Sequence, residues 1–328
     1  MTNVHTYIKN FTDNSAISGS YIINDIQLCT TRAGSQYLRA TLRDASGSIG
    51  MVFWDYSGEI TSESNGVIVD VVGMVGTYRD ALQLCVEQLS PADLSTWDAD
   101  DMAALVPSAP IDVTSYCTYL TNLIRSISTP DLHDICDYLL TSYWPSFCVI
   151  PAGKSVHHSF LHGLLMHTVD MAVVAETVAA NNQRAVNRDL LIAGVLLHDL
   201  GKILEFETSP VTNLVTGYSK LGNLMGHSVL GAMVIAEAAD EVGADPDLAM
   251  MLQHMVLSHH GDPASGAAKV PLIIEAEILH DLDMLDSRKQ IYAESLTHVQ
   301  PQEYSAYIPA LERRIYQHGI TQCCSNES

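Results

Sequence analysis

The sequence predicts a chain of two unlike parts, a small N-terminal β-barrel followed by an all-helical domain. Residues 19–89 form short runs of alternating apolar and polar side chains broken by turn residues, whereas apolar residues recur at helical spacing beyond residue 112. The 328 residues are enough for two domains with buried cores. A hydrophobic content of 47% against 16% charged residues favours folded domains over disorder.

The first part contains about five strands within some 70 residues. Between residues 37 and 43, Leu and Ala occupy the even positions while Tyr, Arg and Thr occupy the odd ones, and DASG and YRDA are typical of hairpin turns. The order of strands and turns resembles an OB-fold, a small barrel of a kind that binds single-stranded nucleic acid. Strand count and turn chemistry also fit other small barrels. We expect this OB-type domain at residues 1–92.

Aromatic residues of this barrel could stack on nucleic-acid bases. The alternative for most of them is that they fill the barrel core, and for Phe53 we prefer that alternative. Tyr37 and Trp54 are therefore the substrate-binding candidates in this part. The aromatic residues are Tyr37, Phe53, Trp54, Tyr56 and Tyr78.

The formal net charge of -22 disfavours non-specific binding to a polyanion, because such binding depends on basic side chains that displace counterions. Residues 1–95 have a net charge of -5 and the remainder has -17. Any contact with nucleic acid must therefore be local. Residues 93–112 contain two Pro and several Asp and form the predicted linker.

Beyond the linker the period is helical, and residues 113–328 are the predicted second domain. Asn187 and Asp245 are typical helix starts, and Gly243 is a typical helix stop. The predicted helices cover residues 113–143, 157–182, 187–200, 226–242, 245–259 and 271–296.

No apolar run approaches the roughly 20 residues that span a bilayer, and the first residues lack the pattern of a signal peptide. We therefore expect a cytoplasmic protein that does not contact membranes. The seven Cys contain no CxxC pair, so disulfides and a Cys-type zinc site are not expected.

His and Asp recur at helix ends and on apolar helix faces of the second part. In LLHDLGK, His198 and Asp199 follow a run of apolar residues that we expect to be buried. Burying an imidazole beside a carboxylate costs free energy unless a partner satisfies both groups. One such pair could satisfy itself, but convergence of many from separate helices points to a metal centre. Nitrogen and oxygen ligands fit Mn, Fe, Ni, Co or Zn. The candidates are His167, His198, Asp199, His227, His259, His260 and Asp283.

The order H, HD, H, HH, D resembles the HD-domain metal-dependent phosphohydrolase superfamily. The full set of motifs is HHxFxxGLLxHT, LLHDLGKI, GHSVLG, LSHHG and EAxxLHxxDxLDS. Joined to an OB-type barrel, it resembles the YhaM family of 3'-to-5' exoribonucleases over residues 19 to about 290. The fold class expected is therefore an OB-type β-barrel followed by an all-α HD domain.

The resemblance implies a first metal held by one group of ligands and a second metal that shares Asp199 with it. Manganese is the preferred metal, with Fe, Co, Ni or Zn as alternatives. The first group is His167, His198, Asp199 and Asp283, and the second is Asp199, His227 and His259, with His260 as a further ligand.

The resemblance further implies hydrolysis of single-stranded RNA, or of single-stranded DNA, to nucleoside 5'-monophosphates. Asp199 and Lys202 are the catalytic candidates, since Lys202 could reach a phosphate oxygen; its alternative role is a helix C-terminal cation. Lys154, His157 and His158 could bind the terminal nucleotide or could be a solvated helix start. A homo-oligomer is left open.

Three other functions use the same features. The first is an HD-domain phosphohydrolase of small nucleotides whose barrel serves assembly, which the net charge favours. The second is a di-iron oxygenase with a similar ligand pattern, which leaves the barrel unexplained. The third is a catalytically inactive binding module, against which the intact ligand set argues.

Overall fold

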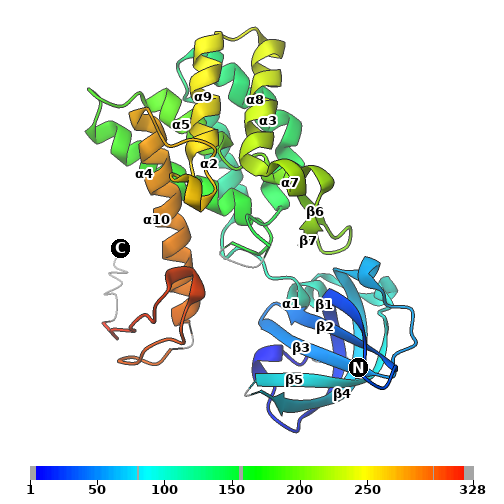
Figure 1. Cartoon of the computed structure of the whole chain (residues 1–328). Coiled ribbons are helices and arrows are strands. Elements are labelled where there is room, and N and C mark those ends of the chain that lie inside the picture. The colour runs from blue at the N-terminus through cyan, green and yellow to red at the C-terminus, as the bar shows by residue number, and fades with distance from the viewer. Residues whose placement is uncertain (1–4, 80, 155–157, 298, 321–328) are drawn as a thin grey trace.

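Five strands close into a barrel at the N-terminal end of the computed structural model, which describes residues 5–79, 81–154, 158–297 and 299–320. They are β1 (Ala16–Thr30), β2 (Gln36–Asp44), β3 (Gly47–Trp54), β4 (Val67–Tyr78) and β5 (Ala81–Pro91). The strands pair in the order β1-β2-β3-β5-β4, and β4 pairs with β1 to close the barrel (Figure 1). β3 and β5 are parallel neighbours. This five-stranded Greek-key order is that of an OB-fold, which confirms the predicted barrel.

The alternation in the sequence places one set of side chains inside the barrel. Leu38 and Leu42 on β2 are fully buried, as are Tyr21 on β1 and Met51 on β3. The hydroxyl of Tyr21 donates a hydrogen bond to the carbonyl oxygen of Thr6, so this large polar ring is satisfied inside the core. The odd positions of β2 face outward, where they can meet a ligand.

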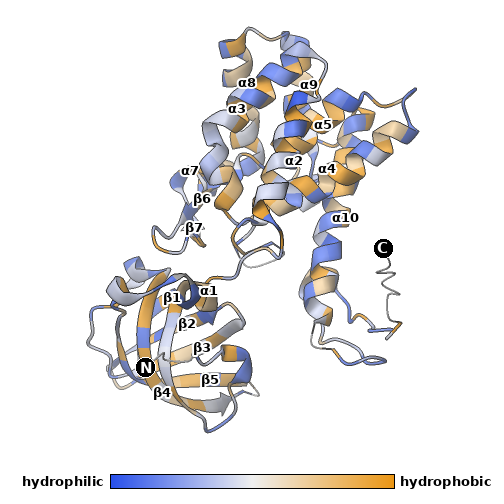
Figure 2. Ribbon diagram, turned by 180° about the vertical axis from the view of Figure 1, so that it is seen from behind, coloured by the Kyte–Doolittle hydropathy of each residue, from blue (hydrophilic) through white to orange (hydrophobic). Residues whose placement is uncertain are grey.

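A short helix, α1 (Ala99–Leu105), follows the barrel, and the rest of the described chain is largely helical. The helices bury one continuous apolar core, and Figure 2 shows that α4 and α5 are predominantly apolar. The remaining elements are α2 (Val113–Arg125), α3 (Pro130–Val149), α4 (Gly163–Asn181), α5 (Arg188–Leu197), α6 (Lys202–Glu205), β6 (Phe206–Thr208), β7 (Val215–Tyr218), α7 (Lys220–Met225), α8 (His227–Val242), α9 (Pro246–Ser258) and α10 (Ile274–Leu296).

The predicted helix at residues 113–143 is two helices. α2 ends at Arg125 and α3 begins at Pro130, a residue that favours the first turn of a helix. The carboxylate of Asp189 accepts hydrogen bonds of 2.8 Å from the backbone N–H groups of Ser128 and Thr129, which stabilises the break. The partner is 60 residues away in sequence, so the break could not be located from local pattern.

Two other segments differ from the predicted pattern. Residues 157–182 were expected to be one helix, but α4 begins at Gly163 because His162 has a left-handed backbone conformation (φ 63°). Strands β6 and β7 form a two-stranded antiparallel hairpin inside the otherwise helical part, so that part is not purely α.

One described helix, α4, is long and apolar enough to cross a membrane by length and composition alone. The helix contains Asp170 and Glu176, so it is not an uninterrupted apolar run. Its apolar character matches its place in the fold: 56% of the apolar window is buried inside the molecule, and α4 packs against α3, α5 and α10. A helix that is apolar around most of its circumference is typical of such a core position.

Candidate metal centre

Seven His and Asp side chains from five helices converge in the helical part. His167 lies on α4 and Asp283 on α10, whereas the others lie at helix ends. His198 and Asp199 follow α5 directly, His227 opens α8, and His259 and His260 follow α9. His198 and His259 are fully buried, and His167 and Asp199 are 2% and 3% exposed.

The first group of side chains surrounds one oxygen of Asp199. The Nε2 atoms of His167 and His198 lie 3.2 Å apart. Oδ2 of Asp199 lies 3.6 Å from Nε2 of His167 and 3.4 Å from Nε2 of His198. Oδ1 of Asp283 lies 3.3 Å from the same atom of His167. Four side chains thus present nitrogen and oxygen atoms to a common point.

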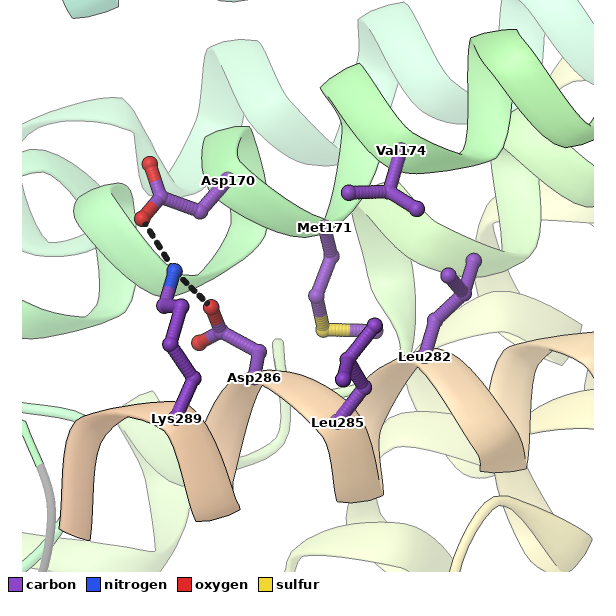
Figure 3. Close-up of a pocket in the computed structure, with 7 residues that line it drawn as sticks. All are labelled: Asp170, Met171, Val174, Leu282, Leu285, Asp286 and Lys289. Carbon is purple, nitrogen blue, oxygen red and sulfur yellow. Dashed lines mark hydrogen bonds and ion pairs between the residues drawn. The ribbon is translucent and has the colours of Figure 1, made fainter. Parts of the chain in front are cut away.

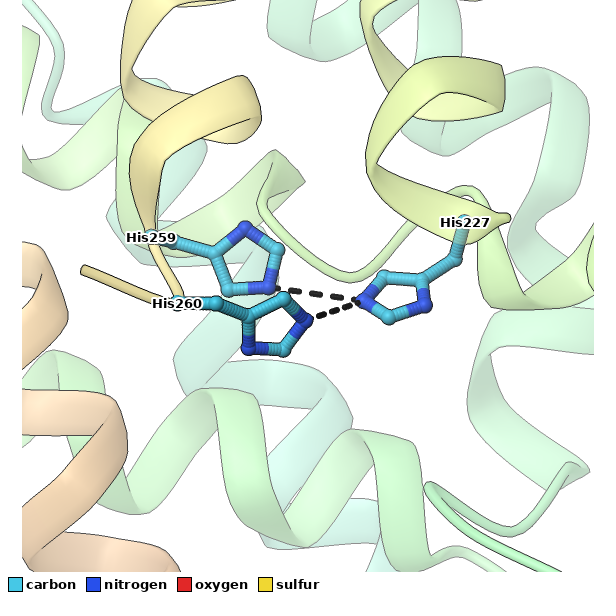
Figure 4. Close-up of side chains that lie close together, drawn as sticks. All are labelled: His227, His259 and His260. Carbon is cyan, nitrogen blue, oxygen red and sulfur yellow. Dashed lines mark hydrogen bonds between the residues drawn. The ribbon is translucent and has the colours of Figure 1, made fainter. Parts of the chain in front are cut away.

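The second group surrounds the other oxygen of Asp199. Nε2 of His227 lies 3.4 Å from Nε2 of His259 and 3.0 Å from Nε2 of His260 (Figure 4). Oδ1 of Asp199 lies 3.6 Å from Nε2 of His227 and 3.9 Å from Nε2 of His259. The Asp199 carboxylate therefore separates the two groups and faces one with each oxygen.

The Nδ1 atoms of four histidines point away from this centre to fixed partners. Those of His198 and His259 lie 2.9 Å and 2.6 Å from the carbonyl oxygens of Val195 and Val256. A carbonyl oxygen only accepts, so Nδ1 carries the hydrogen and Nε2 of the neutral ring keeps its lone pair. Nδ1 of His167 lies 2.7 Å from Asp286, and Nδ1 of His227 lies 3.2 Å from Glu205.

This arrangement fits divalent metal ions. Imidazole lone pairs face one another at about hydrogen-bond distance with the two oxygens of Asp199 between them, an arrangement that a cation stabilises. A ligand histidine typically donates its other N–H to a carboxylate or a backbone carbonyl, as all four do here. The donors are nitrogen and oxygen without sulfur, which matches Mn, Fe, Co, Ni or Zn.

The charges of the centre are also those that bind metal. Burial would raise the pKa of Asp199, but Lys202 and His198 outweigh burial and hold this pKa well below its usual value. Burial and the neighbouring His260 hold the pKa of His259 well below its usual value. Burial would lower the pKa of His167, but hydrogen bonds to two carboxylates, those of Asp283 and Asp286, raise it to about 9. A metal ion competes with that proton, so binding releases it.

Lys202 lies inside the centre. Its Nζ atom is 2.7 Å from Oδ2 of Asp199, and its side chain is 13% exposed. Burial would lower the pKa of Lys202, but the Asp199 carboxylate raises it, so the side chain remains a cation. The structure thus brings Lys202 to the metal ligands; its contact with a phosphate oxygen stays a prediction.

His158 does not lie where a substrate could contact it. The side chain is fully buried, and its Nε2 atom lies 2.8 Å from Oδ2 of Asp286, the oxygen that also pairs with His167. The structure contradicts a direct role in substrate binding, because His158 is buried and shares the Asp286 carboxylate with His167. Lys154 lies 3.7 Å from Asp25 of the barrel, and its role in substrate binding stays a prediction. His157 lies outside the described residues.

Asp286 and Glu205 were not selected from the sequence. Asp286 follows Asp283 by three residues, so helical spacing places it on a similar face of α10, and the quoted DxLDS motif contains it. Lys289 bridges Asp286 and Asp170 at 2.6 Å and 2.8 Å beside a pocket between α4 and α10 (Figure 3). Glu205 ends the short helix α6, where no sequence pattern distinguishes it.

The barrel presents aromatic side chains to solvent. Tyr37 on β2 pairs with Trp54 on β3, and their ring centroids lie 4.9 Å apart. Trp54 is 52% exposed and Tyr78 is 56% exposed, with the guanidinium of Arg79 5.2 Å from the Tyr78 ring. Two further rings belong to the interior: Phe53 packs against the barrel core, as expected, and Tyr56 is buried with its hydroxyl accepting a hydrogen bond from the Ile60 N–H.

Comparison with known proteins places the centre in a defined domain family. Residues 164–288 match the family model described as HD domain, and this stretch contains all seven converging residues. This part of the chain is therefore an HD domain, which indicates a metal-dependent hydrolase. Together with the closed barrel it gives an architecture of an OB-type barrel followed by an HD domain.

Among solved structures, the barrel is similar to the second OB-fold domain of replication protein A from Methanococcus maripaludis. The two are 19% identical over 28% of this chain and 98% of that chain, with a TM-score of 0.22. A replication protein A heterotrimer bound to ssDNA matches 24% of this chain and 59% of its own at 19% identity and a TM-score of 0.21. An OB domain from Thermoplasma acidophilum matches 28% of this chain and 91% of its own at 11% identity and a TM-score of 0.24.

Proposed function

We propose that the chain is a metal-dependent 3'-to-5' exoribonuclease that hydrolyses single-stranded RNA to nucleoside 5'-monophosphates. The observation that carries the proposal is the position of Asp199, with one oxygen facing each of two groups of histidines. Single-stranded DNA is a second substrate that the same chemistry allows. The functional units we propose are the OB-type domain at 1–92, the linker at 93–112 and the HD domain at 113–328.

Two divalent ions would be held by the centre, with manganese as the first choice. When bound, such ions polarise the scissile phosphate and lower the pKa of a bound water. Asp199 would serve both positions. The first position would use His167, His198, Asp199 and Asp283, and the second would use Asp199, His227, His259 and His260.

The chain's own residues fix these ligands and their charge. Backbone carbonyls and two carboxylates hold four imidazoles with Nε2 directed at the centre, so little reorientation is needed when a substrate arrives. Lys202 is a buried cation beside Asp199, in position to offset the charge of a phosphate oxygen. No side-chain nucleophile is required for this hydrolysis.

Burial of the ligands favours attack at the end of a strand. His198 and His259 are fully buried and Asp199 is almost so, which restricts access to the centre. A strand end can enter such a site more easily than the middle of a chain. The 3'-to-5' direction rests on the resemblance to the YhaM family.

The barrel surface supports a nucleic-acid substrate. Tyr37 and Trp54 on β2 and β3, with Tyr78 at the end of β4, form an exposed aromatic surface on the strands through which OB-folds bind oligonucleotides. Arg39 on β2 and Arg79 beside Tyr78 are exposed in the same region, in a chain with a net charge of -22. Stacking with a few local cations is typical of single-strand binding.

The polarity of cleavage tests the proposal. A single-stranded RNA labelled at its 5' end and incubated with the protein and Mn²⁺ should give a ladder of progressively shorter labelled products. The same RNA labelled at its 3' end should release labelled mononucleotide at once. A single internal cut, or release of 5'-end mononucleotide first, would contradict a 3'-to-5' exonuclease.

A phosphohydrolase of small nucleotides is the second candidate, and the net charge of -22 favours it. In that case the barrel would serve assembly and would not bind a strand. Hydrolysis of nucleotides with no cleavage of RNA would establish this alternative.

A further inference from the structure

The outer surface of the barrel is covered by the second part of the chain at one place. Ile22 and Ile68 lie opposite each other on β1 and β4, and both are buried although their neighbours in sequence face the barrel core. They pack with Leu214 from the β6–β7 hairpin, with Leu105 at the end of α1 and with Val106 directly after it. Each of these five residues is at most 6% exposed, so the tip of the hairpin is docked on the barrel.

The backbone before β4 fixes the same contact. The hydroxyl of Ser209 donates a hydrogen bond of 3.0 Å to the carbonyl oxygen of Gly66. Gly66 has a positive φ of 78°, and a Cβ atom there would clash with Cγ2 of Thr216. The hairpin therefore sits against the barrel backbone with no room for a side chain between them.

The other end of the hairpin is attached to the metal centre. Glu205 immediately precedes β6, and its carbonyl oxygen accepts a 2.8 Å hydrogen bond from the N–H of Ser219, directly after β7. Gly222 on α7 packs against the same carbonyl group. Oε1 of Glu205 accepts a 3.0 Å hydrogen bond from the backbone N–H of His227 and lies 3.2 Å from its Nδ1 atom.

We propose that docking of the barrel on the β6–β7 hairpin holds Glu205 in place to orient His227, and so sets the affinity of the second metal position. Glu205 is a positioning residue in this scheme. The barrel then helps to build the metal centre in addition to binding a strand. This inference rests on the proposed function only in taking His227, His259 and His260 as metal ligands.

The test measures Mn²⁺ binding to the full chain by calorimetry and by metal analysis after dialysis. Gly66→Val should force the hairpin off the barrel and weaken the second Mn²⁺ by about 10–100-fold, the usual loss when the partner of a ligand histidine is disturbed. Binding of the first Mn²⁺ should not change. Gly34→Val is the matched control, because Gly34 also has a positive φ (91°) but has open space around it.

A milder variant and a double-mutant cycle complete the experiment. Leu214→Ala should also weaken binding of the second Mn²⁺, and it replaces Gly66→Val as the test if Gly66→Val does not fold. Glu205→Ala should weaken the same position, and adding Leu214→Ala to it should cause no further loss, because both act through His227.

Unchanged binding of the second Mn²⁺ in folded Gly66→Val and Leu214→Ala would overturn the inference and leave the proposed function standing. Additive losses in the double variant would overturn the route through Glu205. A native chain that binds neither Mn²⁺ nor Fe, Co, Ni or Zn ions would overturn the inference and the proposed function together.

Discussion

At the scale of single residues, Asp199 is the side chain on which both groups of ligands depend. Its Oδ2 atom lies 3.4 Å from His198 and its Oδ1 atom lies 3.6 Å from His227. We expect Asp199→Asn to lose metal from both positions and to lower hydrolysis by orders of magnitude, because an amide has no charge and only one ligand oxygen. Metal analysis and turnover on RNA measure this.

The control must separate loss of metal from loss of fold. Asp199→Asn leaves the buried ammonium group of Lys202 without its carboxylate, which costs stability. The double variant Asp199→Asn with Lys202→Met removes that cation, so it should unfold at a temperature close to that of the native protein and still bind no metal. Wild-type activity in Asp199→Asn would contradict the assignment of the centre.

Removing a ligand of the second group alone should have a different effect from removing Asp199. His227→Ala should remove one metal per chain, since it leaves His167, His198, Asp199 and Asp283 in place. Turnover should fall by orders of magnitude, because both ions act on the scissile phosphate. Full turnover with one bound metal would show that the first group suffices.

At the scale of elements, the β2–β3 turn is held by a buried carboxylate. Asp44 is 2% exposed, and its oxygens accept hydrogen bonds of 2.7 Å from the N–H groups of Ile8 and Ser46 and pair with His5 at 3.0 Å. Burial would raise the pKa of Asp44, but these hydrogen bonds outweigh burial and lower it. We expect Asp44→Asn to lower the free energy of unfolding by about 1–3 kcal/mol, because an amide N–H then faces a backbone donor.

The lowered pKa also sets how this loss depends on pH. An ionised carboxylate that is stabilised by folding contributes fully above its unfolded pKa of about 3.9 and loses its contribution as pH falls through the lower folded value. The difference between the native protein and Asp44→Asn should therefore be constant near pH 7 and should shrink below about pH 4. Chemical denaturation over this range measures it, and a difference that grows in acid would contradict the explanation.

The strands and most helices could be predicted because their patterns are local. Alternation in β2 requires only that one face of the strand be buried, as Leu38 and Leu42 are. The break between α2 and α3 depends on Asp189, which is distant in sequence, and no local pattern reveals it. The β6–β7 hairpin is short and obtains its burial from the barrel, so its few residues carry little pattern of their own.

The site was partly predictable for a similar reason. The metal-ligand candidates share a chemistry that recurs along the sequence, and the structure brings all seven together. Their supporting residues have no such common feature. Asp286 contacts both His158 and His167, Glu205 contacts the backbone N–H and Nδ1 of His227, and the burial of His158 depends on the whole fold.

At the scale of the whole molecule, the exposed aromatic surface of the barrel should matter for long substrates and much less for small ones. Trp54→Ala removes an exposed ring that is 4.9 Å from Tyr37. We expect weaker binding of single-stranded RNA by about 1–3 kcal/mol, the usual contribution of one base stack. Cleavage of a small model phosphodiester should not change, because the side chain lies on the barrel.

Phe53→Leu is the control for barrel stability, because Phe53 also lies on β3 but packs against the barrel core. Equal losses of activity on both substrates in Trp54→Ala would show that the barrel serves folding or assembly.

The central claim is that one carboxylate stands between two metal positions, and diffraction from crystals grown with Mn²⁺ tests it most directly. Anomalous difference maps recorded at the manganese edge should show two peaks about 3.5–4 Å apart, one on each side of Asp199. One peak should lie against His167, His198 and Asp283, and the other against His227, His259 and His260. A single peak, or two peaks that do not share Asp199, would contradict the claim.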